Sequence, residues 1–560
     1  MSSVDLDASR AANTALRHGA NAVAAGGATA ATLGVTEPYV AGPGGGGFMV
    51  IYLARQHRVV TINGRETCPA ACTRKLFVEN GKPLGFEEAR HSGLAVGVPG
   101  MVDQWSQAVH RYGHRGFAAD LRPAIYRARH GFRIDRTFVE ETRESLTDLR
   151  AFTSSRSLFL RHGSPLPVGS RLRNPDLAHT YRMIARRGPG YLYDGPLSRA
   201  IAHTVQHPPV WNGTSLTVRP GIMTRRDLHR YHVTEPHPTR VRYRGLDVYG
   251  MPPPSSGGST TGEALNILRG YDMSGAPRAR SLHHYIEALR YSFADRNRYV
   301  GDPHYVDVPL RGLLDPAYAA TRRCLITDHA AHSPVPPGDP YPPFPGCSSA
   351  GSTGSAVDHE QSTNNIVTAD RWGNVVAYTN TIEQFAGTGM TVPGYGFLLN
   401  NEMTDFDFVP SDPGVPDVNL PAGGKIPRSS MNPTIVLRHG RPVFAVGSPG
   451  GATIITTVLQ ILINHIDFGM SLERAIAAPR VGNFNDPASY AEQAFVDSPV
   501  AKRLMQRYGQ ELDVVTGPNP LDKEIGAATG VELLPHHRLR ADAEPVRRGG
   551  GAALVVRPRR

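Results

Sequence analysis

The sequence predicts a globular protein of the α+β class. Helical periodicity runs through residues 100–230 and 282–298, whereas residues 365–379 predict two short strands joined by a turn. The composition, with 40% hydrophobic and 19% charged residues, is that of an ordinary soluble chain and not of a disordered one. A chain of 560 residues accommodates two to four domains, or one large layered domain.

Composition and charge also exclude several classes of protein. The net charge of +11 comes mostly from dispersed arginines, without the lysine-rich or aromatic-interleaved basic stripe typical of nucleic-acid binding. The longest apolar stretches, 21–35 and 454–463, are shorter than the roughly 20 residues that span a bilayer. Met1 is followed by neither a basic nor an apolar segment, so we expect no secretory signal and a cytoplasmic protein. Neither nucleic acid nor a membrane is an expected partner.

The four cysteines, Cys68, Cys72, Cys324 and Cys347, are too few for a disulfide framework in a chain of this length. Cys68 and Cys72 have neither the spacing of a CxxC motif nor that of a zinc site. No HExxH motif occurs among the 23 histidines. We therefore expect no metal and no cofactor, and the scarcity of cysteines favours a reducing compartment.

The first half of the chain begins with a stretch rich in small residues, 11–33, which predicts a closely packed helix. The glycine run 42–48 ends this helix before a predicted strand at 49–53. This run lacks the Lys-Ser/Thr of a P-loop and the spacing of a Rossmann turn. It therefore favours a tight backbone turn over a phosphate-binding loop. Farther on, residues 240–251 alternate like a strand and lead into a rigid bend at 252–258.

The second half begins after the most Pro/Gly/Ser-rich part of the chain, a predicted exposed tether at 333–362. Strands are predicted at 365–369 and 375–379, with a Gly-Asn pair marking the hairpin turn between them. Further strands at 434–437 and 442–446 precede a buried helix at 453–464. A flexible tether thus leads directly into a strand headed by Thr363.

Thr363 is a candidate nucleophile, because GxSxG, SxxK and Cys-His signatures are all missing from the chain. A threonine hydroxyl needs a base, and a free α-amine with a pKa of about 7.7 to 8.0 serves well. Thr363 acquires such an amine if the backbone is cut just before it. By composition alone, a threonine at the start of a strand is usually structural, so the spacing by itself does not decide the matter.

The stretch Thr363-Asn-Asn-Ile-Val-Thr-Ala-Asp370-x-x-Gly-Asn374, followed by Thr381, resembles the nucleophile region of the γ-glutamyltranspeptidase family. Further ordered matches are Asn21-Ala-Val, Thr36-Glu-Pro, Gly44–Phe48, Gly64-Arg-Glu66, Met251–Gly258, Ala294-Asp-Arg, Gly301-Asp-Pro303, Leu399–Phe406, Arg428–Thr434 and Gly447–Gly451. The resemblance implies an N-terminal-nucleophile hydrolase with a four-layer αββα fold. It also implies one precursor that cleaves itself into a large subunit, 1–362, and a small subunit, 363–560, which form a heterodimer.

The resemblance also implies catalytic roles. Thr363 would attack the carbonyl of Ser362 to cleave the precursor and then use its freed amine in turnover. Thr381 matches the threonine that hydrogen-bonds the nucleophile. Gly450 and Gly451 match the pair whose backbone N–H groups form the oxyanion hole, where a side chain would block close approach.

Substrate-binding roles follow in the same way. Arg65 matches the arginine that binds the substrate α-carboxylate, a task suited to a two-pronged donor. Ser429 and Ser430 match the hydroxyls that assist it. Glu402 and Asp405 match the acids that bind the α-ammonium group.

Several positions depart from the family pattern. Asn364 and Asn365 replace residues that are usually small or Thr and then His, and Glu383 replaces a common Asn. A third acid makes the α-amino pocket more acidic, so we expect weak activity on glutathione. The segment 405–429, which forms a lid in many members, is short and has no tyrosine.

The function that the resemblance implies is a γ-glutamyltransferase or hydrolase acting on a γ-glutamyl amide, with water or an amine as acceptor. Two alternatives stay open. One is a pathway-specific relative in secondary metabolism that hydrolyses a different acyl group or a C–C bond. The other is a non-catalytic binding homologue that never matures, against which the intact Thr363, Thr381, Gly450 and Gly451 argue.

Overall fold

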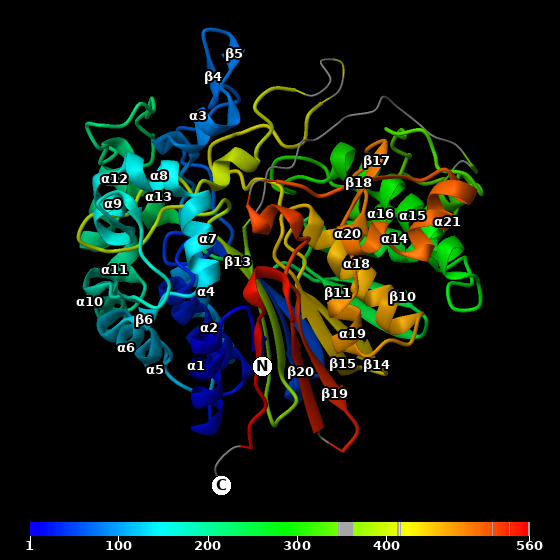
Figure 1. The fold of residues 1–560 in the computed structure, drawn as a ribbon, viewed down its shortest axis with the longest axis horizontal. Helices are drawn as coiled ribbons and strands as arrows, with labels where there is room; N and C mark the ends of the chain where they lie inside the picture. Colours follow the sequence, from blue (N-terminus) through cyan, green and yellow to red (C-terminus); the bar gives the residue numbers. More distant parts are fainter. Residues whose placement is uncertain are drawn as a thin grey trace.

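A computed structural model describes the chain at residues 1–344, 346–347, 362–410, 414, 416–517, 519–536 and 538–557 (Figure 1). The end of the predicted tether, 348–361, therefore lies outside the described residues. In the described parts, no helix has both the length and the apolar composition needed to cross a bilayer.

The first of two six-stranded sheets carries the predicted hairpin at its centre, and its order is β21-β1-β12-β13-β2-β3. Its strands are β1 (Ser2–Ser3), β2 (Gly46–Leu53), β3 (Arg58–Asn63), β12 (Asn364–Ala369), β13 (Val375–Thr381) and β21 (Ala552–Ala553). All neighbours are antiparallel, and β12 pairs with β13 in the register Asn364 with Asn380. The predicted hairpin is confirmed.

The glycine run before β2 is a tight corner, as predicted. A Cβ on Gly44 would lie 2.1 Å from the carbonyl oxygen of Leu398, and one on Gly45 would lie 2.1 Å from that of Thr381. Only glycine lets the backbones approach this closely.

The second sheet has the order β10-β11-β14-β15-β19-β20. Its strands are β10 (Thr239–Tyr243), β11 (Leu246–Gly250), β14 (Thr434–Arg438), β15 (Arg441–Gly447), β19 (Thr529–Leu534) and β20 (Arg538–Ala543). The prediction of one strand over 240–251 is wrong, because the chain turns at Arg244 and Gly245, which have φ of +48° and +78°. The alternation continued through the turn because both strands bury the same face.

Helices of the first half share one hydrophobic core with the first sheet. They are α1 (Leu6–Arg17), α2 (Ala22–Thr36), α4 (Met101–Tyr112), α5 (Phe117–Asp120), α6 (Arg122–His130), α7 (Arg136–Glu144), α8 (Leu146–Ala151), α9 (Thr153–Phe159), α10 (Pro175–Arg187), α11 (Gly190–Tyr193), α12 (Pro196–Gln206) and α13 (Arg225–Arg230). Of these helices, α1, α2 and α4 contact the strands of the sheet directly. The predicted single helix over 11–33 is wrong. Gly19 breaks it with φ of +85°, and the Asn21 side chain then caps α2 by accepting from Ala24 N.

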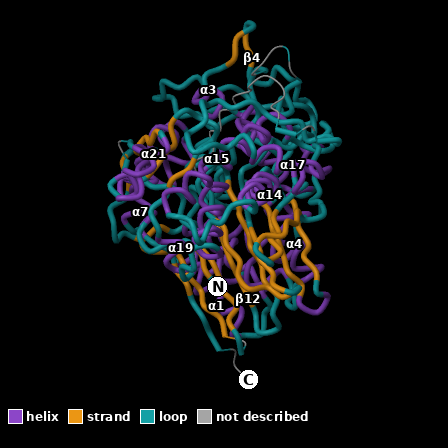
Figure 2. The backbone as a smooth tube through the Cα atoms, turned by 90° about the vertical axis from the view of Figure 1, so that its right-hand side faces the viewer, coloured by secondary structure: helices purple, strands orange, loops and turns teal. Residues whose placement is uncertain are grey.

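A second group of helices lies beside the second sheet (Figure 1). It comprises α14 (Gly257–Leu268), α15 (Arg278–Tyr299), α16 (Leu310–Leu313), α17 (Pro316–Arg323), α18 (Thr453–Ile466), α19 (Leu472–Ala477), α20 (Gln493–Val496) and α21 (Pro499–Tyr508). Apolar residues of both sheets and of α14, α15 and α18 share one hydrophobic core. In Figure 2 most of the strands, drawn in orange, lie below α14 and α15. The mixed α+β class is confirmed, whereas the four-layer order stays a prediction.

The structure pairs all four cysteines, as Cys68–Cys72 and Cys324–Cys347. The cysteines are few, as the sequence shows, but they are not free thiols: one pair is local, with a separation of four residues, and the other joins cysteines 23 residues apart. Disulfides persist mainly in oxidising compartments, so cysteine content no longer favours a reducing one. The cytoplasmic location stays a prediction.

Candidate active site

Thr363 lies immediately before β12, with its hydroxyl against the peptide bond that is predicted to be cut. Thr363 Oγ1 donates to the carbonyl oxygen of Ser362 at 2.5 Å, and Thr381 Oγ1 donates to the same oxygen at 2.7 Å. The register of β12 and β13 places these two threonines beside each other. All three residues are buried. Two hydroxyl donors on one carbonyl oxygen polarise that carbonyl for attack.

Glu383 holds Ser362 through its backbone. The Glu383 carbonyl accepts from Ser362 N at 3.1 Å and from Ser362 Oγ at 2.7 Å, while Glu383 N donates to Thr381 Oγ1 at 2.8 Å. Its φ of +82° lies in the left-handed region, which a glutamate seldom adopts. The buried carboxylate accepts hydrogen bonds from the amide of Asn401 and, at 3.4 Å, from that of Gln384. Glu383 thus shapes the cleavage site as well as its surroundings.

Arg65, Glu402 and Asp405 form one buried ion-pair group, which we call the Arg65 cluster. Arg65 follows β3, and its two terminal nitrogens pair separately with Glu402 and Asp405. The two acids lie three residues apart on a 3-10 turn (Glu402–Asp405), which presents both on one side. All three side chains are at most 3% exposed. The acids predicted to bind an ammonium group are therefore already paired with the arginine predicted to bind a carboxylate.

Ser429 and Ser430 are held by the Pro-Ser-Gly bend before α14. Ser256 N and Oγ both donate to the carbonyl of Ser429, at 2.7 and 2.8 Å. Arg296 of α15 donates to Ser256 Oγ and to Ser430 Oγ, each at 2.8 Å. The bend thus fixes the serine pair, and Arg296 supplies a buried positive charge beside it.

Two asparagines connect these groups. Asn401, whose amide binds Glu383, also donates from its backbone to the carbonyl of Ile382 at 3.2 Å. Asn419 Nδ2 donates to the carbonyl of Asp405 at 2.7 Å, and its Oδ1 accepts from Arg428 N at 2.9 Å. The loop after β13, the Arg65 cluster and the serine pair therefore belong to one hydrogen-bonded site.

Gly450 and Gly451 lie between β15 and α18, with φ of +127° and +59°. A Cβ on Gly450 would lie 2.3 Å from Thr453 Oγ1, so a side chain is excluded there. Gly447, at the end of β15, approaches the side chain of Asn365 so closely that a Cβ would lie 2.2 Å from its Oδ1. Gly447 therefore packs on β12 close to the nucleophile, and the glycine pair follows it in the chain.

In the described part of segment 405–429, Lys425 binds the chain that precedes it. Lys425 Nζ donates to the carbonyls of Val418 and Leu420, both at 2.8 Å. Burial lowers the pKa of Lys425 to about 8, although Asp302 opposes the shift. Residues 411–413 and 415 of this segment lie outside the described residues.

Sequence reasoning missed two further arginines near the nucleophile. Arg548, 185 residues from Thr363, donates to its carbonyl at 3.1 Å. Arg90 donates to the carbonyls of Phe385 and Gly387, at 2.8 and 3.2 Å, and so supports the loop that carries Glu383. No local motif marks either residue, because both act across long sequence separations.

One group among the described residues has metal-ligand chemistry, namely Glu87, His91 and Asp148, with candidate atoms within 4.8 Å of one another. Arg90 already donates to Glu87 at 3.2 Å and to Asp148 at 2.5 Å within this group. A metal ion would have to displace that guanidinium, so we interpret the group as support for Arg90.

Comparison with known proteins decides the family. The profile of the Gamma-glutamyltranspeptidase family matches residues 8–554. The chain belongs to this family. The glutathione hydrolase proenzyme of Bacillus subtilis (strain 168) is 38% identical over 494 residues, covering 87% of this chain and 81% of the relative. The acylase ACY 1 proenzyme of Pseudomonas sp. (strain SE83) is 34% identical over 560 residues, covering 98% and 93%.

A solved structure shares the fold over the whole chain. Cephalosporin acylase from Bacillus halodurans has a TM-score of 0.86 at 26% identity, covering 100% of this chain and 96% of that chain. The resemblance to the γ-glutamyltranspeptidase family is thereby confirmed. The roles of individual residues stay predictions, because a match over the whole chain tests none of them singly.

Proposed function

We propose that the chain is a precursor that cleaves itself between Ser362 and Thr363 and then hydrolyses or transfers a γ-glutamyl group. The observation that carries the proposal is the pair of threonine hydroxyls, Thr363 and Thr381, on the Ser362 carbonyl oxygen. Family membership and the glutathione hydrolase proenzymes among its relatives support it. The matured enzyme would be a heterodimer of 1–362 and 363–560.

Cleavage follows from this geometry by an acyl shift. Thr363 Oγ attacks the carbonyl carbon of Ser362, and the C–N bond breaks as the nitrogen takes up a proton. Water then hydrolyses the resulting ester, leaving a carboxylate on Ser362 and a free α-amine on Thr363. That amine accepts the hydroxyl proton in later turnovers, which gives an acyl-enzyme with the substrate and releases its amine.

Substrate binding is assigned to the groups around the nucleophile. Backbone N–H groups of Gly450 and Gly451 would stabilise the oxyanion. The Arg65 cluster, together with Ser429 and Ser430, would bind the amino-acid end of the γ-glutamyl group. The ion pairs of Arg65 then have to rearrange or share their hydrogen bonds with the substrate.

Two measurements on the purified protein test the proposal. Denaturing electrophoresis should show two chains, and the smaller should begin Thr-Asn-Asn-Ile-Val by N-terminal sequencing. The matured protein should release p-nitroaniline from γ-glutamyl-p-nitroanilide. A single uncut chain, or another N-terminus, contradicts the assignment of Thr363.

A second candidate function is an acylase for substrates without an α-amino group. It is favoured by the Arg65 cluster, whose acids already have an arginine as their cation. The acylases among the similar proteins also support it. Glutaryl-p-nitroanilide lacks only the α-amino group of the γ-glutamyl compound, so the ratio of kcat/KM for the two substrates separates the candidates.

A further inference from the structure

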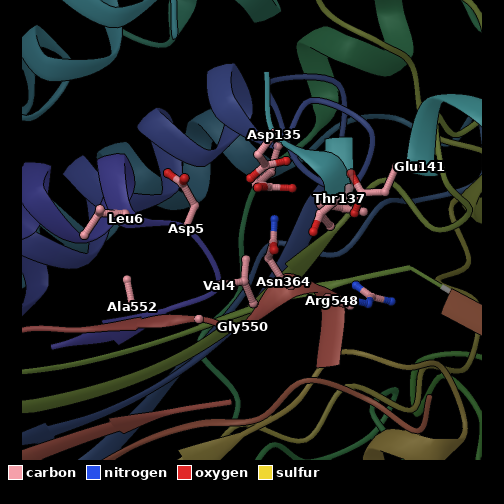
Figure 3. A pocket seen from close by; sticks show the side chains of 14 residues that line it. Val4, Asp5, Leu6, Asp135, Thr137, Glu141, Asn364, Arg548, Gly550 and Ala552 are labelled. Atoms are coloured by element: carbon pink, nitrogen blue, oxygen red, sulfur yellow. The ribbon is translucent and has the colours of Figure 1, made fainter. Parts of the chain in front are cut away.

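A cavity lies next to the nucleophile strand, and we call it the Glu141 cavity (Figure 3). Its volume is about 240 Å³, and it is lined by α1, α7, the start of β12 and the segment 548–552. Asn364, the residue after Thr363, points into it.

The cavity lies on the other face of β12 from the nucleophile. Successive side chains of a strand point to opposite faces. Ile366 packs with the α2 core and Thr368 Oγ1 donates to the Ala22 carbonyl, whereas Val367 packs in the core between the sheets. Asn364 shares the face of Ile366 and Thr368, so the cavity is separate from the acyl-binding site.

One wall of the cavity is acidic. Asp5, Glu37, Asp135 and Glu141 line it, and among the described lining residues Arg548 is the one cation. Helix capping explains Asp5 and Asp135, which accept hydrogen bonds from the first turns of α1 and α7. Capping does not explain Glu37 and Glu141.

Two side chains in the cavity point to a missing ligand. The amide of Asn364 is fully buried, and neither its oxygen nor its nitrogen has a hydrogen-bond partner among the described residues. Glu141 is 1% exposed, and its Oε2 likewise has none within that part of the chain. Buried polar atoms are normally satisfied, so the Asn364 oxygen and Glu141 Oε2 indicate an absent donor.

The cost of burying these acids is also not fully offset by nearby positive charge, as their pKa values show. Burial raises the pKa of Glu141 to about 8, against the opposing charge of Arg548. Burial and the neighbouring Glu141 raise the pKa of Glu37 well above its usual value. A bound cation would remove this penalty.

The size and the lining of the cavity indicate which kind of cation it can hold. The carboxylates of the cavity do not form one of the compact ligand groups found among the described residues, so their placement does not favour a bare metal ion. The volume is far larger than the share of a single water, about 30 Å³. Val4, Leu6 and Val40 form an apolar wall beside the acids. The cavity therefore matches a cationic head with a short apolar body.

We propose that the Glu141 cavity binds a small organic ammonium ligand with a short alkyl chain. The ammonium group donates to Glu141, Glu37 and the Asn364 oxygen, and the alkyl chain lies against Val4 and Val40. The site adjoins the nucleophile through Asn364 and through Arg548, which donates to the Thr363 carbonyl. This proposal does not rest on the proposed enzymatic function.

Calorimetric titration of the purified full chain with n-butylammonium chloride tests the proposal. Ammonium, potassium and magnesium chlorides at equal ionic strength are the comparison ligands. We expect butylammonium to bind most tightly. Tighter binding of magnesium or potassium, or no binding of any cation, overturns the proposal.

Charge-neutral variants locate the site. Glu141→Gln should weaken butylammonium binding at least about tenfold, because a charge-assisted hydrogen bond is lost. Glu140→Gln removes the same charge one residue away on α7, outside the cavity lining, and should leave binding unchanged. If Glu141→Gln fails to fold, Glu37→Gln serves in its place. Equal loss in the cavity variant and in Glu140→Gln would mean non-specific attraction and would refute the site.

Discussion

The Arg65 cluster and the Glu141 cavity are two buried acidic groups, and they differ in how their charge is neutralised. Asn364 joins the cavity to the nucleophile strand. Glu383 and Asn401 link the Arg65 cluster to Ser362.

In the Arg65 cluster, Glu402 and Asp405 each pair with a separate nitrogen of one arginine. In the Glu141 cavity, four carboxylates share Arg548, and the Oε2 atom of Glu141 has no hydrogen-bond partner in the described structure.

The difference lies in how many acids each arginine serves. A buried charge is costly unless it is paired and hydrogen-bonded. In the Arg65 cluster each acid has its own ion pair, although the Glu402 oxygens have no further hydrogen-bond partner among the described residues, so a substrate has to compete with existing ion pairs. In the Glu141 cavity four acids line the same space as Arg548, so a cationic ligand adds an ion pair without displacing one.

The largest effect is expected from removing the nucleophile, on which the proposed substrate-binding role of the Arg65 cluster depends. Thr363→Ala should leave one uncut chain and abolish turnover of γ-glutamyl-p-nitroanilide, because no hydroxyl remains to attack Ser362. Electrophoresis and the p-nitroaniline assay measure both effects. Thr363→Ser keeps the hydroxyl and should still cleave. Two chains from Thr363→Ala would show that another residue cuts the precursor.

The next test disrupts the ion pairs of the Arg65 cluster. Arg65→Lys should fold and mature, but its kcat/KM should fall about ten- to a hundredfold. A lysine cannot serve Glu402, Asp405 and a substrate with two-pronged geometry, and such contacts are worth about 1.5 to 3 kcal/mol. Arg58→Lys, on the exposed start of β3, is the matched control. Unchanged kcat/KM in Arg65→Lys would make Arg65 purely structural.

A smaller effect is expected from Glu383, the acid that holds Ser362 and binds the Asn401 amide. Glu383→Asn should raise glutathione hydrolysis about tenfold, the equivalent of one polar contact of about 1.4 kcal/mol. Asn also tolerates the left-handed φ of +82° better than Glu does, so the variant should remain folded. The rate on glutathione is compared with that on γ-glutamyl-p-nitroanilide. Robust wild-type glutathione turnover, with no gain in the variant, would refute the role of Glu383.

The smallest effect concerns the protonation of Glu141 in the Glu141 cavity. The pKa of Glu141 is raised to about 8, above its value of about 4.3 in an unfolded chain, so the native state binds more protons between these values. The contribution of Glu141 to stability is thus present at low pH and lost as pH rises toward 8. The other groups facing it are Asp5, Glu37, Asp135 and Arg548.

Thermal unfolding at pH 5 to 9 measures this effect. The Tm of the wild type should fall with pH by a few degrees more than that of Glu141→Gln, while Glu140→Gln should behave like the wild type. Parallel curves for the wild type and Glu141→Gln would show that Glu141 stays ionised, and the case for an absent cation would weaken.

Local features were predictable because they depend on neighbouring residues. The hairpin at β12 and β13, the glycine corner before β2 and the buried helix α18 all follow from alternation, turn residues and apolar runs. The errors arose where a pattern ran through a turn, as at Gly19 in the predicted helix and at Arg244 in the predicted strand. Periodicity does not register a change of direction when both sides bury the same face.

The sequence by itself determined the family and the candidate nucleophile, because ordered motifs and a strand that begins at the end of a tether are local properties. Only the tertiary structure decided which charges meet. Arg65 and Asp405 are 340 residues apart, and Arg548 lies 185 residues from Thr363. Such contacts depend on how sheets and loops pack, and packing is governed by burial and shape over the whole chain. For the same reason, the two unpartnered groups of the Glu141 cavity became visible only once α7 lay over the start of β12.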